Sequence, residues 1–267
     1  MLHVSIVIYK HLYSETESLI HVLRESEVVE KIYIIDNSPV PSCDFKQEGL
    51  TYIFTGKNIG YGAAHNIALR KTIAAGVPYH LVVNPDITMD AHILKEMVEY
   101  LEQNTDIGHL MPKIVYPSGE TQYLCKLIPA PSDLIFRRFL PKKWTEKRMY
   151  RFEMRNTGYD KIMDIPYLSG CFMLLRTEAL KKTGLFDERF FLYPEDIDLT
   201  RRIGIHYRTV FYPRVSVVHH HAQESYKSLY MMLVHSWNLT KYFNKWGWIF
   251  DKQRKEINQQ YIKKYNL

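Results

Sequence analysis

The sequence predicts an α/β fold built on a doubly wound, mostly parallel β-sheet. The first observation is that short apolar runs alternate with amphipathic helical stretches over residues 1–115. The second is that these runs are almost continuously hydrophobic, as expected of strands that are covered on both faces. Such alternation favours βαβ units and hence parallel strands. The 267 residues, 46% of them apolar, suffice for one large domain with a proper core.

The expected elements follow one another regularly up to residue 116. Each expected strand is an apolar run, and each expected helix has an apolar period near 3.6 residues. The strands are placed at 3–9, 31–36, 50–55, 79–84 and 107–116, and the helices before 26, at 61–75 and at 90–103.

The second half of the chain is less regular. From 117 to about 165 it is basic, aromatic and punctuated by proline, which indicates an insertion or a mobile region. Order returns with "IPYLSGCFMLLR" (165–176), a strand in which Ser169-Gly170 marks a bulge or a close backbone approach. The runs "YRTVFY" and "VSVVHHH" precede a segment, 226–265, of helical period.

Composition argues against several classes of protein. Cys43, Cys125 and Cys171 show neither a disulfide framework nor a zinc spacing, which favours a reducing compartment. The N-terminal apolar run lacks a basic leader and a cleavage site, so it indicates a strand instead of a signal peptide. No stretch approaches the roughly 20 apolar residues that span a bilayer. We therefore expect a cytoplasmic protein.

The net charge of +6 is concentrated in two segments. Residues 129–155 contain eight Lys/Arg against three Asp/Glu, and residues 241–264 contain seven against two, interleaved with aromatic residues. This pattern is typical of a segment that meets an anionic membrane surface. A solvated helical face packed on the catalytic domain, or a homodimer contact, explains it equally well. Nucleic-acid binding is a weaker alternative, because no helix-turn-helix, RNP or zinc pattern accompanies the charge.

Polar residues follow four of the expected strands. They are Tyr9-Lys10, "DNS" (36–38), "KNIGYGAAHN" (57–66) and "NPD" (84–86). Each alone is ordinary turn chemistry. Ligands of open α/β sheets bind beyond the carboxyl ends of the strands, so the four together predict a binding site at one edge.

The glycines of "KNIGYGAAHN" are unlike a dinucleotide fingerprint. Gly60 and Gly62 have the G-x-G spacing, but the third small position falls on His65, and the motif follows the third strand. A tight turn into a helix is the better interpretation. Asn58 and Asn66 would then be available for a ligand or for bracing the loop.

Three further motifs carry candidate reactive groups. Asp86 could bind a divalent cation or cap a turn. In "VVHHH", His219 and His221 share one face of a strand, and one of them could be a neutral imidazole ligand. "FFLYPEDIDLTRR" (190–202) has proline and acids where a helix begins, which complements the helix dipole, but the aromatic run could also shape a pocket around the acids.

Taken in order, these motifs resemble a family 2 glycosyltransferase of the GT-A fold, of the kind that builds bacterial surface polysaccharides. The likeness runs from residue 3 to about 250 and is greatest to the rhamnosyltransferase-like branch, where N-P-D replaces D-x-D. It rests on "IIDNS", "NIGYGAAHNIAL", "VVNPDI", "YLSGCFMLLR", "GLFDERFFLYPEDIDLTRR" and "VVHHH".

The resemblance implies a role for each motif residue. Asp196 would be the catalytic base, with Glu195 beside it making contacts elsewhere, and Asp36 would contact the nucleotide base. Asp86 would bind Mg²⁺ or Mn²⁺, with His219, or its rival His221, completing the metal site. The residues expected to line the nucleotide-sugar pocket are Tyr9, Asp36, Asn37, Asn58, Gly60, Asn66, Asn84, Ser169 and Gly170.

The implied activity is inverting transfer of a sugar to a hydroxyl of a glycan or of a polyprenyl-diphosphate-linked acceptor. The expected donor is dTDP-rhamnose first and a UDP-hexose second, and a non-catalytic sugar-nucleotide-binding protein is the alternative. We expect a catalytic domain at 1–225 and a helical extension at 226–267. The first would divide into a nucleotide-sugar half (1–115), a basic insertion (116–165) and an acceptor half (166–225). A peripheral location of the protein on the inner face of the plasma membrane is the alternative to a freely cytoplasmic one.

Overall fold

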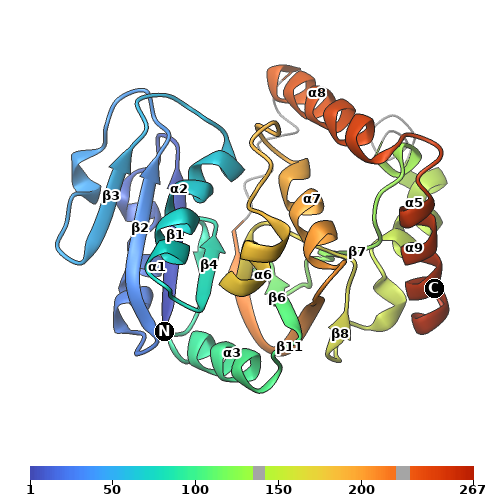
Figure 1. Ribbon diagram of the computed structural model, residues 1–267, viewed down its shortest axis with the longest axis horizontal. Coiled ribbons are helices and arrows are strands. Elements are labelled where there is room, and N and C mark those ends of the chain that lie inside the picture. Colours follow the sequence, from blue (N-terminus) through green and yellow to red (C-terminus); the bar gives the residue numbers. More distant parts are fainter. Residues whose placement is uncertain (135–141, 221–228) are drawn as a thin grey trace.

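The structure is a computed structural model of the chain, and it describes residues 1–134, 142–220 and 229–267. Its central feature is a nine-stranded sheet in the order β3-β2-β1-β4-β10-β6-β11-β5, with β8 beside β11 (Figure 1). The strands are β1 (Leu2–Ile8), β2 (Val29–Asp36), β3 (Leu50–Phe54), β4 (Tyr79–Val83), β5 (Ile87–Thr88), β6 (Ile107–Val115), β8 (Met163–Asp164), β10 (Phe172–Arg176) and β11 (Arg208–His219).

The sheet is mostly parallel, as predicted. β3, β2, β1 and β4 are parallel neighbours, and β6 is parallel to β11. β10 is antiparallel to both β4 and β6, while β5 and β8 pair antiparallel with β11. A second, two-stranded sheet joins β7 (Cys125–Lys126) to β9 (Tyr167–Leu168).

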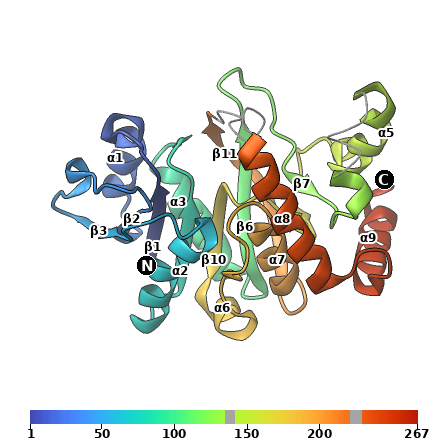
Figure 2. The same cartoon turned by 90° about the horizontal axis from the view of Figure 1, so that it is seen from above.

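Helices cover both faces of the large sheet (Figure 2). On one face, Val4 and Ile6 of β1 belong to a buried cluster with Leu19 and Leu23 of α1 (Glu17–Glu25), which also takes in α3 (His92–Gln103). The other face carries α2 (Tyr61–Ala74), α6 (Thr177–Thr183) and α7 (Pro194–Ile203). Within β4, Leu81 belongs to the first cluster and Val82 to the second. This double coverage explains the continuous apolar runs of the sequence.

Two expectations about the strands need correction. The expected strand at 165–176 is two strands, because the chain turns at Ser169-Gly170 and β9 leaves the large sheet. The runs "YRTVFY" and "VSVVHHH" are one strand, β11, whose register with β6 shifts between Tyr212 and Ser216. The segment 117–165, expected as an insertion or mobile region, contains α5 (Lys142–Phe152).

The C-terminal segment is helical, as predicted. α8 (Leu229–Trp246) crosses the top of the molecule in Figure 1, and α9 (Lys252–Tyr265) lies beside α5. The guanidinium of Arg201 on α7 forms a bidentate ion pair with Asp251, each bond 2.7 Å long, and both side chains are buried. Among the described residues, no helix has the length and hydrophobicity that crossing a membrane requires. The division of the chain at 115, 165 and 225 stays a prediction.

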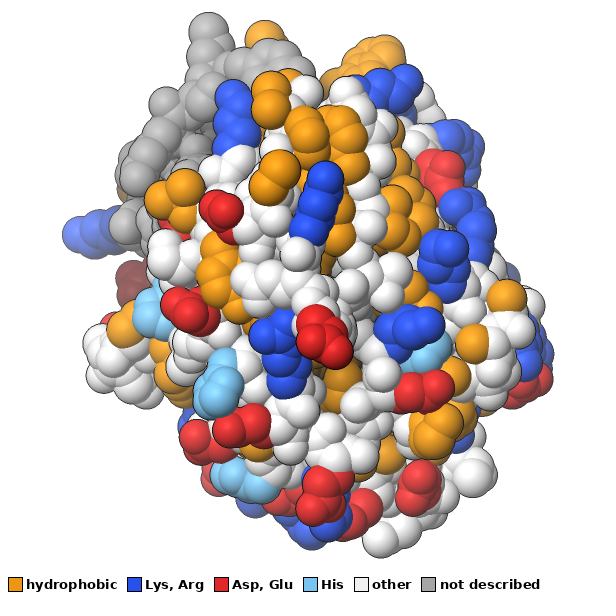
Figure 3. Space-filling model, turned by 90° about the vertical axis from the view of Figure 1, so that its left-hand side faces the viewer, with side chains coloured by type: hydrophobic (Ala, Val, Ile, Leu, Met, Phe, Trp, Pro, Cys, Tyr) orange, Lys and Arg blue, Asp and Glu red, His pale blue; other side chains and the backbone are white. Residues whose placement is uncertain are grey.

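Figure 3 shows the face at the β3 edge of the sheet. Charged side chains of both signs are mixed on it, with Asp and Glu gathered toward its lower end. This agrees with a positive excess concentrated in the segments 129–155 and 241–264.

Candidate active site

The candidate site begins where the chain enters α7. Tyr193, just before the helix, has φ +93° and ψ −60°, a conformation that is strained for any residue other than glycine. Pro194 occupies the first turn, where its missing N–H costs nothing. Glu195 and Asp196 follow and are only 4% and 8% exposed. The acidic pair is therefore enclosed by protein, unlike the exposed acids of an ordinary helix start.

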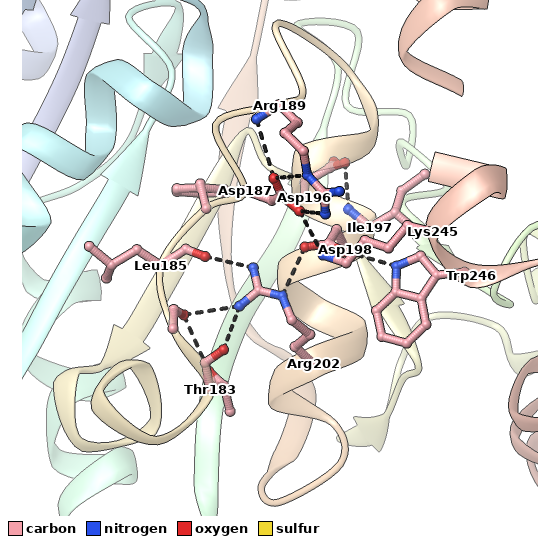
Figure 4. Close-up of polar contacts among 12 residues, drawn as sticks. Thr183, Leu185, Asp187, Arg189, Asp196, Ile197, Asp198, Arg202, Lys245 and Trp246 are labelled. Carbon is pink, nitrogen blue, oxygen red and sulfur yellow. Dashed lines mark hydrogen bonds and ion pairs between the residues drawn. The ribbon is translucent and has the colours of Figure 1, made fainter. Parts of the chain in front are cut away.

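Asp196 is fixed by three donors. Its Oδ2 accepts from Gly170 N (2.9 Å) and from the Tyr167 hydroxyl (3.2 Å), and its Oδ1 accepts from Ile197 N (2.7 Å). Figure 4 shows Asp196 and Ile197 at the start of α7. Burial raises the pKa of Asp196 to about 6, although these hydrogen bonds act in the opposite direction. At neutral pH Asp196 is mostly ionised and able to accept a proton.

Glu195, beside it, is shifted toward its protonated form. Burial, and then the charge of Asp196, raise the pKa of Glu195 well above its ordinary value. Its Oε2 is buried and has no hydrogen-bond partner among the described residues. The two carboxyl groups therefore differ in protonation, which allows one to act as a base.

Gly170 makes the close approach that the sequence predicts for Ser169-Gly170. A Cβ at this position would lie 3.0 Å from the Cβ of Asp196 and 3.3 Å from its Oδ2. The absence of a side chain lets the backbone N–H of the β9–β10 turn reach the carboxylate. Ser169 lies in the same turn.

Tyr61, the first residue of α2, links this turn to the end of β4. Its hydroxyl lies 2.9 Å from Asn84 Oδ1 and 2.9 Å from Gly170 O. Burial, followed by the nearby acidic side chains, raises the pKa of Tyr61 well above the ordinary value, so its hydroxyl remains a donor; those side chains are Cys171, Glu195, Asp196 and Asp86. In the sequence Tyr61 is one residue of the motif "KNIGYGAAHN", and no local signal distinguishes a donating tyrosine from a packed one.

The expected metal ligands also come together. His219 Nε2 lies 3.3 Å from Asp86 Oδ1 and 3.4 Å from Asn84 Nδ2. His219 Nδ1 lies 3.0 Å from Gln122 Oε1, while Gln122 Nε2 donates to the carbonyl of His219 (2.7 Å). Gln122 therefore orients the imidazole, a role that the sequence analysis missed because the two residues are distant along the chain.

The pKa of His219 reflects its neighbours. Burial lowers it, but hydrogen bonds and charge from Asp86 and Cys171 raise it to about 10. His220 is exposed and contacts Thr88, as expected of the opposite face of the strand, whereas His221 lies outside the described residues. Within the described ranges, no cluster of three or more His, Cys, Asp or Glu side chains could hold a metal ion.

Asp36, at the end of β2, belongs to a different network. Its Oδ1 accepts from Ser38 N (2.9 Å), and its Oδ2 accepts from Ser42 N (3.1 Å) and the Tyr52 hydroxyl (2.5 Å). Although burial opposes it, these hydrogen bonds lower the pKa of Asp36. The residue is 0% exposed, so its carboxylate shapes the loop after β2.

Asn37, Asn58 and Gly60 complete this second network. Asn37 Nδ2 donates to Gly60 O (3.1 Å), and Gly60 N donates to Asn58 Oδ1 (3.0 Å). Gly60 has φ +94°, and a Cβ there would lie 2.6 Å from Phe191 O. Tyr61 N donates to the same carbonyl (3.0 Å), which joins the two networks.

The remaining two candidates lie apart from these networks. Asn66 donates to Phe186 O and Glu188 Oε1 and accepts from Phe186 N, so of its two expected roles it takes that of bracing a loop. The placement of Asn66 in the nucleotide-sugar pocket stays a prediction. Tyr9 is 44% exposed at the end of β1, with Lys10 Nζ 5.3 Å from its ring centre.

Solved structures with the same architecture identify the fold as GT-A. A mannosyltransferase of Pyrobaculum calidifontis, solved with GDP-Man and Mn²⁺, superimposes with a TM-score of 0.57 at 15% identity, over 91% of this chain and 63% of that one. TarS of S. aureus, residues 1–349, gives 0.56 at 15% identity, over 87% and 64%. At such identities the likeness concerns the fold alone.

Residues 40–233 match the family model described as glycosyltransferase like family 2, and the chain belongs to this family. The N-acetylglucosaminyl-diphospho-decaprenol L-rhamnosyltransferase of Mycobacterium tuberculosis is 31% identical over 191 residues, which cover 64% of this chain and 59% of the relative. Rhamnosyltransferase WbbL of Escherichia coli is 28% identical, over 67% and 68%. The match thus spans less than two thirds of the first relative's length. The predicted family and its rhamnosyltransferase-like branch are confirmed.

Proposed function

We propose that the protein is an inverting glycosyltransferase that moves a sugar from a nucleotide-sugar donor to a hydroxyl of a glycan or lipid-linked glycan acceptor. One observation carries this proposal: Asp196 is connected to Asp86 and His219 by direct contacts through Gly170, Tyr61 and Asn84. A base and a diphosphate-binding group thus share one site. A donor of dTDP-rhamnose, before a UDP-hexose, and a role in surface polysaccharide synthesis follow from the likeness to rhamnosyltransferases.

Asp196 acts as the base in this reaction. The acceptor oxygen bonds to the anomeric carbon while the bond from that carbon to the diphosphate oxygen breaks, and the hydroxyl proton passes to Asp196. A base whose pKa is about 6 is ionised at pH 7 and still holds a proton strongly enough to assist the attack. Burial and the charge of Asp196 favour the protonated form of Glu195, and in that form it does not compete for the proton.

Asp86 and His219 are the residues that would hold a divalent cation. Their Oδ1 and Nε2 atoms converge within 3.3 Å, and Asn84 adds an amide beside them. Carboxylate oxygen and neutral imidazole suit Mn²⁺, and carboxylate suits Mg²⁺. Because the pKa of His219 is about 10 beside Asp86, the imidazole would have to release a proton to bind the cation. When bound, the cation would neutralise charge on the departing diphosphate.

An interfacial location at the inner face of the plasma membrane is part of the same proposal. Trp248, Ile249 and Phe250, between α8 and α9, are 42%, 78% and 95% exposed, and basic residues of α9 follow them. Exposed apolar side chains next to cations suit an anionic lipid surface.

Asp196→Asn tests the proposal. We expect transfer to fall at least about 1000-fold, because the variant lacks the base, while nucleotide binding stays within about threefold. Asp90→Asn, at an exposed position, is the matched control. Sugar release from a panel of nucleotide sugars with Mn²⁺, together with calorimetry of the nucleotide, measures both quantities. Substantial transfer by Asp196→Asn would reject the base, and a wild type that binds nucleotide without turnover would be a sugar-nucleotide sensor.

A further inference from the structure

A basic pocket lies between the segment 187–191 and the second half of α8. Its volume is about 360 Å³, and it is lined by Arg189, Lys241, Asn244 and Lys245. Pockets of this size accept small-molecule groups. None of these four residues contributes to the base, to the candidate metal ligands or to the loop around Asp36.

The cations of the pocket are held in place by two carboxylates. Arg189 binds Asp187 through two hydrogen bonds (2.9 and 2.6 Å), and Lys245 Nζ lies 2.8 Å from Asp187 Oδ2 and 2.5 Å from Asp198 Oδ1. Asp198 is also bound by Arg202 (2.8 Å) (Figure 4). Two carboxylates thus serve three cations before Lys241 is counted.

Lys241 supplies the excess charge. Its Nζ donates to the carbonyl of Arg189 (2.8 Å), and among the described residues it forms no ion pair with a carboxylate. The pocket is therefore preorganised and positively charged. A phosphate-bearing ligand would complete it, because each Lys and Arg head group offers further donors.

The pocket adjoins α7, the helix that carries Asp196. Lys245 contacts Asp198, which lies on α7 two residues after Asp196. Asn238 of α8 accepts from Phe191 N (3.0 Å), and the carbonyl of Phe191 receives Tyr61 N. A ligand that fills the pocket therefore lies beside the segment that carries the base.

An apolar surface continues from the pocket along α8. Leu233 and Trp237 are 60% and 63% exposed, and they precede Lys241 at intervals of four residues. Residues at this spacing share one helix face. Lys241 Nζ lies 5.8 Å from the Trp237 ring centre, so the apolar part and the basic part of the face adjoin.

We infer that this pocket binds the diphosphate of an amphiphilic, lipid-linked acceptor, whose hydrocarbon chain runs over Trp237 and Leu233. The inference rests on the proposed function, because it names the acceptor side of the same site. Charge complementarity selects a phosphate group, and the adjoining apolar face selects a phosphate that carries a lipid chain. The diphosphate of the donor has its own place at Asp86 and His219.

The inference is tested by calorimetry with farnesyl diphosphate in the presence of EDTA. EDTA removes divalent cations, so the ligand cannot bind through a metal at the donor site. We expect saturable binding that weakens with salt, and at least about tenfold weaker binding of farnesol and of inorganic diphosphate. Lys241→Glu should weaken farnesyl diphosphate binding at least about tenfold, and Lys241→Arg should retain it. Lys71→Glu, at an exposed position in the last turn of α2, makes the same charge change away from the pocket and should bind within about twofold of wild type.

Three results would overturn the inference. Equal loss in Lys241→Glu and Lys71→Glu would indicate a general charge effect. Equal binding of inorganic diphosphate would show that the lipid chain is not recognised. Binding to phosphatidylglycerol vesicles that matches binding to vesicles doped with farnesyl diphosphate would assign the surface to lipid headgroups. Sugar transfer is measured separately, so an enzyme that transfers sugar yet fails these tests refutes the pocket and leaves the proposed function intact.

Discussion

The end of β2 and the start of α7 each carry a buried aspartate, and the two carboxylates are held in opposite ways. Asp36 accepts three hydrogen bonds from the loop that follows it and from Tyr52, and its pKa is lowered. Asp196 also accepts three, but its pKa is raised to about 6, and a second buried carboxyl group adjoins it. The number of donors therefore does not decide the protonation state.

This difference indicates that the loop around Asp36 is a fixed structural element, whereas the start of α7 has the features of a reactive site. The loop around Asp36 has its polar groups satisfied within the chain, so a nucleotide would meet a preformed surface. At α7 the chain accepts a strained Tyr193, and Glu195 Oε2 is without a partner among the described residues. Strain and unsatisfied groups concentrated at one place are typical of functional sites.

The largest expected effect comes from breaking the connection between the two regions. Gly60→Ala places a Cβ 2.6 Å from Phe191 O at φ +94°, and we expect a loss of about 3 kcal/mol in the free energy of unfolding. Gly76→Ala is the control, because Gly76 has φ +72° with nothing within 4 Å, and should cost about 1 kcal/mol. Urea unfolding measures both, and equal losses would show that the contact with Phe191 is unimportant.

The same substitution should change stability in opposite directions in the two regions. Asp36 has a lowered pKa, so its contribution is present above its ordinary pKa and is lost as the pH falls through the folded-state value. Asp196 has a raised pKa, so its contribution is present below 3.8 and is lost as the pH rises through about 6. At pH 7.5 we expect Asp36→Asn to destabilise and Asp196→Asn to stabilise, each by about 2 kcal/mol. Chemical denaturation curves that move in the same direction would contradict this comparison.

Tyr61→Phe should break the link between the turn at Gly170 and the end of β4 at Asn84, with a smaller effect. The variant keeps the ring but loses the hydroxyl that reaches Asn84 and Gly170. We expect kcat to fall about tenfold, which corresponds to about 1.4 kcal/mol, with nucleotide binding within about twofold. Tyr207→Phe, next to the start of β11 and far along that strand from His219, is the matched control. Unchanged kcat in Tyr61→Phe would show that the link is dispensable.

The pH dependence of transfer should give the smallest change. Because the base must be ionised, kcat rises with pH through about 6, and it should double between pH 6 and pH 8. Initial rates at constant ionic strength check this expectation. A rate that falls over the same interval would mean that the essential group acts in its protonated form.

The fold was largely predictable because the spacing of apolar residues along the sequence follows which faces of each strand and helix are buried. The runs that became β1, β2, β4 and β6 are covered on both faces, and this condition leaves a direct trace in the sequence. The antiparallel placement of β10 and the departure of β9 were not predictable, because they depend on pairing between segments far apart in the chain.

The site was predictable where a residue type fixes its own geometry. Gly170 was expected at a close backbone approach because glycine alone tolerates it. The role of Asp196 as the base, which the family resemblance implies, stays a prediction. Tyr61 and Gln122 were missed, because their partners lie 23 and 97 positions away or more. For Asn66 the sequence allowed two roles, and only the neighbouring Phe186 selects between them.

The ion pair between Arg201 and Asp251 makes the C-terminal helices inseparable from the catalytic machinery. A chain shortened before Asp251 would leave the guanidinium of Arg201 without its counter-ion, on the helix that bears Asp196. Such a loss costs several kcal/mol, comparable to the whole margin by which proteins stay folded. Removal of the chain from Asp251 onward would therefore inactivate the enzyme by destabilising its fold, whichever acceptor it uses.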